Sequence, residues 1–65
     1  MVRDKLSPRL REVLGLLAEG YTYQEIAERL VLSRHSVRTY VHRILVTLDA
    51  RNAKQAIAIL LRERV

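Results

Sequence analysis

A run of hydrogen-bond donors occupies residues 34–43, which contain three arginines, two histidines, one serine and one threonine. Arginine can place two parallel hydrogen bonds on a guanine, and threonine can offer its hydroxyl to a base or its methyl group to a thymine. Arginine and serine can also hold phosphates, which fix orientation without reading the base sequence. These residue types therefore suit the recognition of nucleic acid, and of duplex DNA in particular.

The spacing of these residues predicts a helix with two different faces. One apolar stripe follows the 3.6-residue period of an α-helix and consists of Val37, Val41, Ile44 and Leu48. At 100° per residue, the side opposite this stripe carries His35, Arg38, Thr39 and His42. The flanks carry Arg34 on one side and Ser36 and Arg43 on the other. Because any solvated helix is charged on its outer face, the neighbouring elements must decide between a binding surface and a merely exposed one.

The segment before the donor run predicts a short helix that would position it. Thr22 and Glu25, three residues apart, form a capping box, in which each side chain satisfies a backbone N–H of the first helical turn. The helix is expected over residues 23–30. Its inner face is formed by Ile26, Ala27 and Leu30, and the small Ala27 allows a second helix to come close.

A tight turn then leads directly into the helix that carries the donors. Leu32 lies in this turn and can fill the angle between the two helices, and Ser33 can cap a helix expected over residues 34–48. A capped helix, a three-residue turn and an arginine-bearing helix form a helix-turn-helix, the motif that places its second helix in the major groove of DNA. This order favours the binding surface over the solvated face.

The residues before the motif predict another helix, over 8–19. Ser7 can cap it, and proline at the first helical position, Pro8, loses no hydrogen bond. The buried stripe of this helix consists of Leu10, Val13, Leu14 and Leu17. Leu16 lies off the stripe and is expected to be exposed, residues 1–6 form a charged lead, and Gly20 suits a left-handed helix end.

A fourth helix is expected over residues 53–62, after a short connector at 49–51. Asn52 and Gln55 form a second capping box at its start. The helix has more apolar residues than one core-facing stripe can use, and the surplus consists of Ala53, Ala58 and Ile59. A surplus apolar face on a terminal helix indicates a surface for a protein partner. The alternative is that the alanines are only good helix formers and Ile59 is a tolerated exposed residue.

Length and composition limit the classes of function. The 65 residues are expected to form a single all-α domain over 1–65, with one core and no large internal cavity. Twelve Lys plus Arg against seven Asp plus Glu give a net charge of +5, and ten of the twelve basic residues are arginine, which a GC-rich genome would also produce. The absence of cysteine excludes disulfides and thiolate metal sites. No membrane span or signal peptide is visible, so we expect a soluble, cytoplasmic protein.

Catalysis and metal binding fit the sequence poorly. His35 and His42 are seven residues apart on one face, with no carboxylate beside them to orient either ring. A metal site would need further ligands, and the chain has no cysteine and no third histidine. We therefore expect no enzyme activity, no metal, no cofactor and no small-molecule ligand.

Four blocks of the sequence, in order and with matching gaps, resemble the LuxR-type (FixJ or NarL-type) DNA-binding domain of bacterial transcription regulators. These blocks are LSPRLREVLGLLAEG at residues 6–20, EIAERLVLS at 25–33, SVRTYVHRIL at 36–45 and LDARNAKQAI at 48–57. The resemblance covers residues 6–61. It implies a compact four-helix domain whose third helix enters the major groove and whose fourth helix mediates dimerisation.

The resemblance also implies roles for individual residues. The side chains nearest the bases would be Arg38, Thr39 and His42, with His35 on the same face. Backbone contacts would come from Arg34, Ser36, Arg43 and Arg51, to which the Tyr40 hydroxyl is added because its ring lies at the edge of the core stripe. The sequence departs from the family pattern at four places, which are Leu10 for a frequent glutamate, Tyr40 for histidine, Val46-Thr47 for lysines and Asp49 for glycine.

Two other classes of function compete with this interpretation. Region four of a bacterial sigma factor has a helix pair similar to the one that begins with TYQEIAERL, and it binds promoters together with RNA polymerase. Such regions usually end after the second helix of this pair, whereas this chain continues through RNAKQAIAILL into a further helix. A helical protein-interaction module could use the apolar fourth helix instead. The expected partners are double-stranded DNA and a second copy of the chain, with RNA polymerase as a further candidate. The segment is either the output domain of a longer regulator or a small regulator by itself.

Overall fold

The computed structural model describes residues 5–63 and is helical, with no strand in that range. Its helices are α2 (Pro8–Ala18), α3 (Tyr23–Leu30), α4 (Arg34–Leu48) and α5 (Ala53–Glu63). The all-α architecture of four helices with an internal helix-turn-helix is therefore confirmed. The expected bounds of α3 and α4 agree with the structure, while α2 ends one residue earlier and α5 one residue later than expected. Residues 1–4 of the expected charged lead lie outside the described residues.

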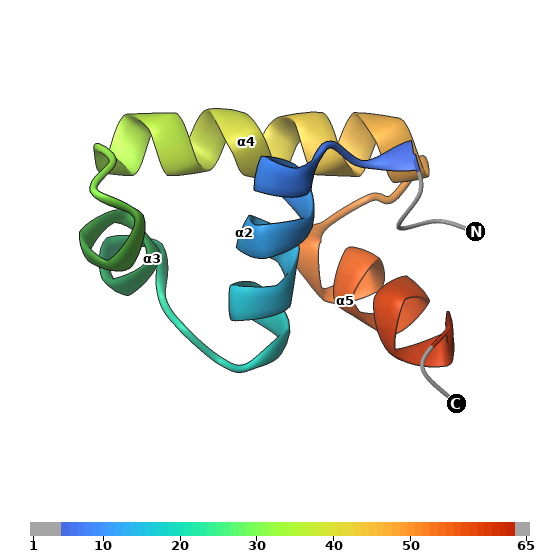
Figure 1. Ribbon diagram of the computed structural model, residues 1–65. Helices are drawn as coiled ribbons and strands as arrows, with labels where there is room; N and C mark the ends of the chain where they lie inside the picture. Colours follow the sequence, from blue (N-terminus) through green and yellow to red (C-terminus); the bar gives the residue numbers. More distant parts are fainter. Residues whose placement is uncertain (1–4, 64–65) are drawn as a thin grey trace.

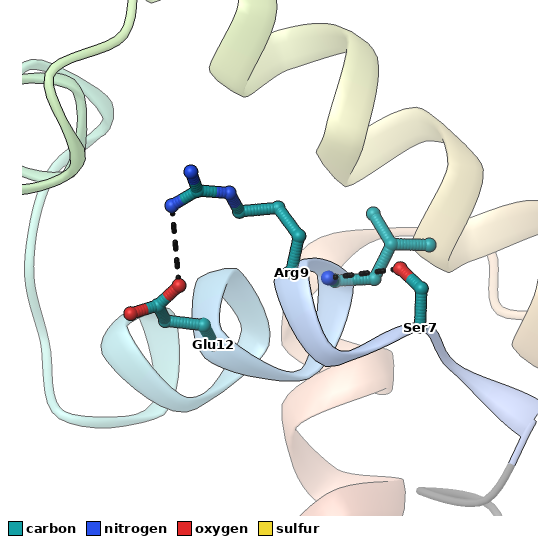
Figure 2. A network of polar contacts seen from close by, with 4 residues as sticks. Ser7, Arg9 and Glu12 are labelled. Carbon is teal, nitrogen blue, oxygen red and sulfur yellow. Dashed lines mark hydrogen bonds and ion pairs between the residues drawn. The ribbon is translucent and has the colours of Figure 1, made fainter.

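Hydroxyl side chains start three of the helices, as their positions in the sequence predicted. The Oγ of Ser7 accepts the Leu10 N–H at 3.3 Å (Figure 2). At the start of α3 the box is complete, since Thr22 Oγ1 accepts the Glu25 N–H at 3.1 Å and Glu25 Oε1 accepts the Thr22 N–H at 2.8 Å. Ser33 caps α4 in the same way. Each bond satisfies a donor that the first helical turn would leave unpaired.

Residues with a left-handed backbone conformation follow the ends of α2, α3 and α4. Gly20 follows α2 with φ 97°, where the lack of a Cβ removes the steric penalty. The two other such residues are not glycines, namely Val31 after α3 with φ 55° and Asp49 after α4 with φ 53°. In the turn after α3 the Leu32 N–H donates to the Ala27 carbonyl at 2.8 Å. The left-handed conformation of Val31 lets the chain leave α3 and enter α4 within three residues.

One hydrophobic core joins all the helices. Its buried members are Leu6, Val13, Leu14, Ile26, Ala27, Val37, Val41, Ile44, Ala56 and Leu60. Two of our expectations are wrong here. Leu6 belongs to the core, with 4% of its surface exposed, and Leu16 packs against it. Leu16 is partly buried although it lies off the stripe, because α2 contacts α3, α4 and α5 and not one neighbour alone.

The start of α5 differs in detail from the predicted capping box. The Gln55 N–H donates to Asn52 Oδ1 at 2.8 Å, as expected. The return bond goes to a different residue, because Gln55 Oε1 accepts the N–H of Arg51 at 2.6 Å and not that of Asn52. The connector after α4 is therefore tied to the first turn of α5.

The helices leave one long side of α4 uncovered. Figure 1 shows α4 lying across one side of the domain, with α3 near its N-terminal end, α5 near its C-terminal end and α2 between them. The buried residues of α4 are Val37, Val41 and Ile44, three of the four that the apolar stripe predicted, and Leu48 is partly buried against the core. Within the described residues, no helix is long and apolar enough to cross a bilayer.

Candidate nucleic-acid interface

The α3–turn–α4 unit fixes the direction in which α4 presents its outer face. Ile26 and Ala27 of α3 are buried, and α3 packs against α4. Ala27 has no side chain beyond Cβ, so the two helix backbones can approach closely at this point. Leu32 in the turn is partly buried against the core, as predicted for a residue that fills the angle between the helices. The packing of α3 against α4, with Leu32 in the turn, thus fixes the inner face of α4 toward the core.

The outer face of α4 carries the residues predicted to read bases. His35, Arg38 and His42 are exposed, and Thr39 is half-buried. The flanking residues predicted to hold phosphates are also accessible, since Arg34 and Arg43 are exposed and Ser36 is half-buried. The structure therefore brings these seven residues onto one accessible surface, which we call the α4 outer face.

Two hydroxyl groups on this face have defined hydrogen bonds. Ser33 Oγ accepts the Ser36 N–H at 3.0 Å and donates to Ser36 Oγ at 3.0 Å. Ser36 Oγ is thereby an acceptor in this pair, and its own proton remains available to an outside acceptor such as a phosphate. Thr39 Oγ1 donates to the His35 carbonyl at 3.1 Å, so its proton is already in use within α4.

The electrostatics of the α4 outer face are uniformly basic. No acidic residue occurs between Glu28 and Asp49 in the sequence. Among the described residues, Arg34, Arg38 and Arg43 make no ion pair. A guanidinium without a partner keeps all its donors for a ligand. This arrangement favours an anionic partner with hydrogen-bond acceptors.

Two arginines elsewhere in the domain, Arg9 and Arg29, are engaged within the fold. Figure 2 shows Arg9 on α2 reaching Glu12, with Nη1 and Oε1 3.2 Å apart. The guanidinium of Arg29 on α3 lies over the Tyr21 ring, 4.7 Å from its centroid. The arginines of α4 differ from these two because their side chains have no such partner among the described residues.

Two further predicted backbone contacts border this face. Tyr40 is half-buried and its ring packs against the core, which agrees with its place at the edge of the apolar stripe. Arg51 is exposed in the connector, and its backbone is fixed by the hydrogen bond to Gln55. The core holds the Tyr40 ring and the hydrogen bond to Gln55 holds the Arg51 backbone, so both residues have a defined starting point from which to reach a ligand.

Sequence reasoning did not assign Val46 to the α4 outer face. Val46 is 67% exposed and follows Thr39 by seven residues, a spacing that returns to nearly the same side of a helix. The signal was present in the same helical period that identified the donors. Val46 was instead treated only as a replacement for a lysine.

The apolar surplus on α5 is real but differs in composition from the prediction. Ala58 is exposed and Ile59 is half-buried outside the core cluster. Ala53 was wrongly placed in the surplus, because it packs against the core three residues before the buried Ala56. Leu61 is 44% exposed and adds to the apolar surface of α5. We call Ala58 and Ile59 the α5 apolar patch, while Leu61, two residues after Ile59, lies on the opposite flank of the helix.

The described residues show no cluster of three or more His, Cys, Asp or Glu side chains placed to bind a metal ion. His35 and His42 both lie on the exposed side of α4. Their position among arginines, without a carboxylate from the same helix, suits hydrogen bonding to a ligand better than metal binding.

The chain is similar to full-length transcription regulators of bacteria. It is 41% identical over 51 residues to the DNA-binding transcriptional activator DevR/DosR of Mycobacterium tuberculosis, an alignment that covers 78% of this chain and 24% of that protein. It is 36% identical over 62 residues to the uncharacterized transcriptional regulatory protein YxjL of Bacillus subtilis, covering 95% and 28%. With the transcriptional regulatory protein LiaR of B. subtilis the identity is 40% over 53 residues, covering 82% and 25%.

The chain therefore spans about a quarter of the length of the curated relatives it matches. These relatives are regulators and not enzymes, which agrees with the expectation that the segment performs no catalysis. Residues 4–60 match the sequence model of the bacterial regulatory proteins of the luxR family, a match that includes the whole helix-turn-helix and most of α5. By this match, this chain belongs to the luxR family of bacterial regulatory proteins.

Proposed function

We propose that this domain binds double-stranded DNA in a sequence-specific manner, with α4 in the major groove, as the output domain of a bacterial transcription regulator. The observation that carries the proposal is the α4 outer face, whose arginines have no ion-pair partner among the described residues and no acidic neighbour along the helix. An α-helix fits the major groove, and the helix-turn-helix presents its second helix to that groove. The name of the relative DevR/DosR as a DNA-binding transcriptional activator supports the same function.

The roles divide by position on α4. Arg38, Thr39, His42 and His35 lie outside the buried stripe and are proposed to face the base edges. Residues on the flanks and beyond the C-terminal end are proposed to hold the DNA backbone, namely Arg34, Ser36, Tyr40, Arg43 and Arg51. The free proton of Ser36 supports its assignment to a phosphate, since a phosphate only accepts hydrogen bonds.

We further propose that the domain acts as a weak homodimer through the α5 apolar patch, on a site with two half-sites. Ala58 and Ile59 are not used by the core, and a small apolar patch provides too little area for a stable dimer without DNA. A two-fold dimer predicts half-sites about one helical turn, roughly 10 base pairs, apart. The proposed setting is the bacterial cytoplasm, where the chromosome lies, and a contact with RNA polymerase remains a prediction without support from a particular residue.

The test is a titration of the domain with a labelled duplex at several salt concentrations. Counterion release makes the logarithm of the association constant fall linearly with the logarithm of salt, by about 0.9 per phosphate contacted. We expect a steep slope that becomes shallower by about one when Arg43 or Arg51 is replaced by alanine. Arg9→Ala is the matched control, because Arg9 is paired with Glu12 on α2. An affinity that does not depend on salt would contradict the proposal.

A further inference from the structure

The hydroxyl group of Thr39 is bonded within α4, in the middle of the α4 outer face. Its Oγ1 donates to the carbonyl oxygen of His35, one turn earlier, at 3.1 Å. His35 and His42, one turn before and one turn after it, are exposed, so Thr39 lies among the residues proposed to face the bases. Such a bond to the preceding turn is a common local arrangement for threonine in a helix.

This bond changes what Thr39 can offer to a ligand. A hydroxyl has one proton, and here the proton is directed at the helix backbone. The remaining substituent on Cβ is the methyl group, which is not held by the hydrogen bond. Thr39 therefore has no proton to donate to a base, and what it can offer is its methyl group and the lone pairs of Oγ1, which could only accept.

We propose that Thr39 recognises the 5-methyl group of a pyrimidine in the major groove. This inference rests on the proposed function and deepens it by naming the chemical group that is read. Thymine displays a 5-methyl group in the major groove, and apolar side-chain atoms make the favourable contact with it. Cytosine lacks the group unless it is methylated at the same carbon. Binding by this domain is then sensitive to cytosine methylation at the base pair that Thr39 contacts.

The test uses a matched pair of substitutions that separate the two substituents on Cβ. Thr39→Val keeps a methyl group and a branched Cβ but removes the hydroxyl, whereas Thr39→Ser keeps the hydroxyl and removes the methyl group. A preferred duplex is first selected from a random library with the unmodified chain. Each thymine of that duplex is then replaced singly by deoxyuridine, which lacks only the 5-methyl group. Thermal unfolding of each variant confirms that the fold is retained.

The expected result is one thymine in each half-site whose replacement weakens binding by about fourfold, the factor that corresponds to burying one methyl group. The same loss should occur with Thr39→Val and should disappear with Thr39→Ser. Cytosine at that position also lacks the 5-methyl group, so a duplex with cytosine there should bind as weakly as the deoxyuridine duplex, before any separate effect of replacing a T·A pair by a C·G pair. A duplex with 5-methylcytosine at the same position should bind about fourfold more tightly than the duplex with cytosine. The cytosine pair distinguishes reading of the methyl group from reading of the thymine carbonyl.

Three outcomes would overturn the inference. Thr39→Val could lose as much affinity as Thr39→Ser, which would mean that the hydroxyl is the recognised group. The penalty for deoxyuridine could be equal in all three proteins, which would assign the methyl contact to another residue, or no thymine could show a penalty. Failure of the proposed function looks different, because no preferred duplex would then be selected and Arg38→Ala would leave duplex binding unchanged.

Discussion

Ser33 binds Ser36 twice, accepting its backbone N–H and donating to its side-chain oxygen, each at 3.0 Å. The first bond caps α4, and the second orients the Ser36 hydroxyl so that its proton is free. Ser33 therefore stabilises the start of α4, and the Ser36 hydroxyl is able to donate to a ligand. The two roles predict different effects of the same substitution.

Ser33→Ala should lower the free energy of unfolding by about 1 kcal/mol, because the N-terminal turn of α4 loses its cap. Ser36→Ala should leave stability nearly unchanged, since the Ser36 N–H still reaches Ser33. Its DNA affinity should fall, because a phosphate donor is lost. Urea unfolding and DNA titration of both variants check this division. Equal losses of stability would show that the side-chain bond between the serines is structural.

Arg38 and Arg51 should differ in how their loss depends on the DNA sequence. Arg38→Ala should cost about 1–3 kcal/mol on the preferred site and relax the preference at one base pair, as expected for an arginine on a guanine. Arg51→Ala should weaken preferred and scrambled duplexes by nearly the same factor, because phosphates carry no sequence information. Binding curves on both duplexes measure the difference. Identical ratios for the two variants would refute the assignment of base reader and backbone anchor.

Tyr40→Phe separates the ring from the hydroxyl of a residue that packs against the core. The ring contacts remain in the variant, so the melting temperature should change little. DNA affinity should fall by about fivefold, the value of one ordinary hydrogen bond, if the hydroxyl reaches a phosphate. A large drop in melting temperature with unchanged affinity would instead make the hydroxyl structural.

Ile59→Glu should disrupt the proposed dimer contact without affecting α4. Ile59 is half-buried but lies outside the core cluster, so the fold should survive. The measured quantity is the ratio of affinities for a double and a single half-site in the same variant, which cancels the general effect of an added negative charge. We expect this ratio to fall towards one and the two-to-one complex to disappear from a mobility-shift gel. If only Leu61→Glu has this effect, the contact uses the other side of α5.

Val31→Gly should stabilise the domain. Val31 is a β-branched residue with φ 55° and is 89% exposed, so its side chain adds strain and little packing. Glycine removes a left-handed penalty of about 1–2 kcal/mol. Part of this stabilisation is offset, because glycine increases the conformational entropy of the unfolded chain. The melting temperature should rise by a few degrees. Asp49→Gly is the control, and it should gain less because aspartate tolerates φ 53° better than valine does.

Local patterns were sufficient to predict the helices and the donor face. The caps at Ser7, Thr22 and Ser33 and the apolar period of α4 depend only on residues within one or two turns of each other. Those signals do not require knowledge of the rest of the fold. The same period could also have placed Val46 on the outer face, since it lies seven residues after Thr39.

Errors occurred where distant segments decide the environment. Leu16 lies off the stripe of α2 but is partly buried because α2 contacts α3, α4 and α5. Leu6 has no periodic partner in its own segment, so only the packed structure shows its burial. Ala53 was placed in the surplus for the same reason, since the positions of residues around a short helix do not show how far its neighbours extend along it. The contacts with bases and with a second copy involve atoms outside the chain and remain predictions.

The hydrogen bond from the Arg51 N–H to Gln55 ties Arg51 to the first turn of α5, whereas the Ala50 N–H before it donates to the Leu45 carbonyl of α4. A residue proposed to grip the DNA backbone thus moves together with the helix proposed to join two copies. In a dimer formed through α5, the contact between the two α5 helices then sets the distance between the two Arg51 backbones. Half-sites at other separations would be rejected by geometry even when every base is correct, and Gln55→Ala should widen the range of spacings that the domain accepts.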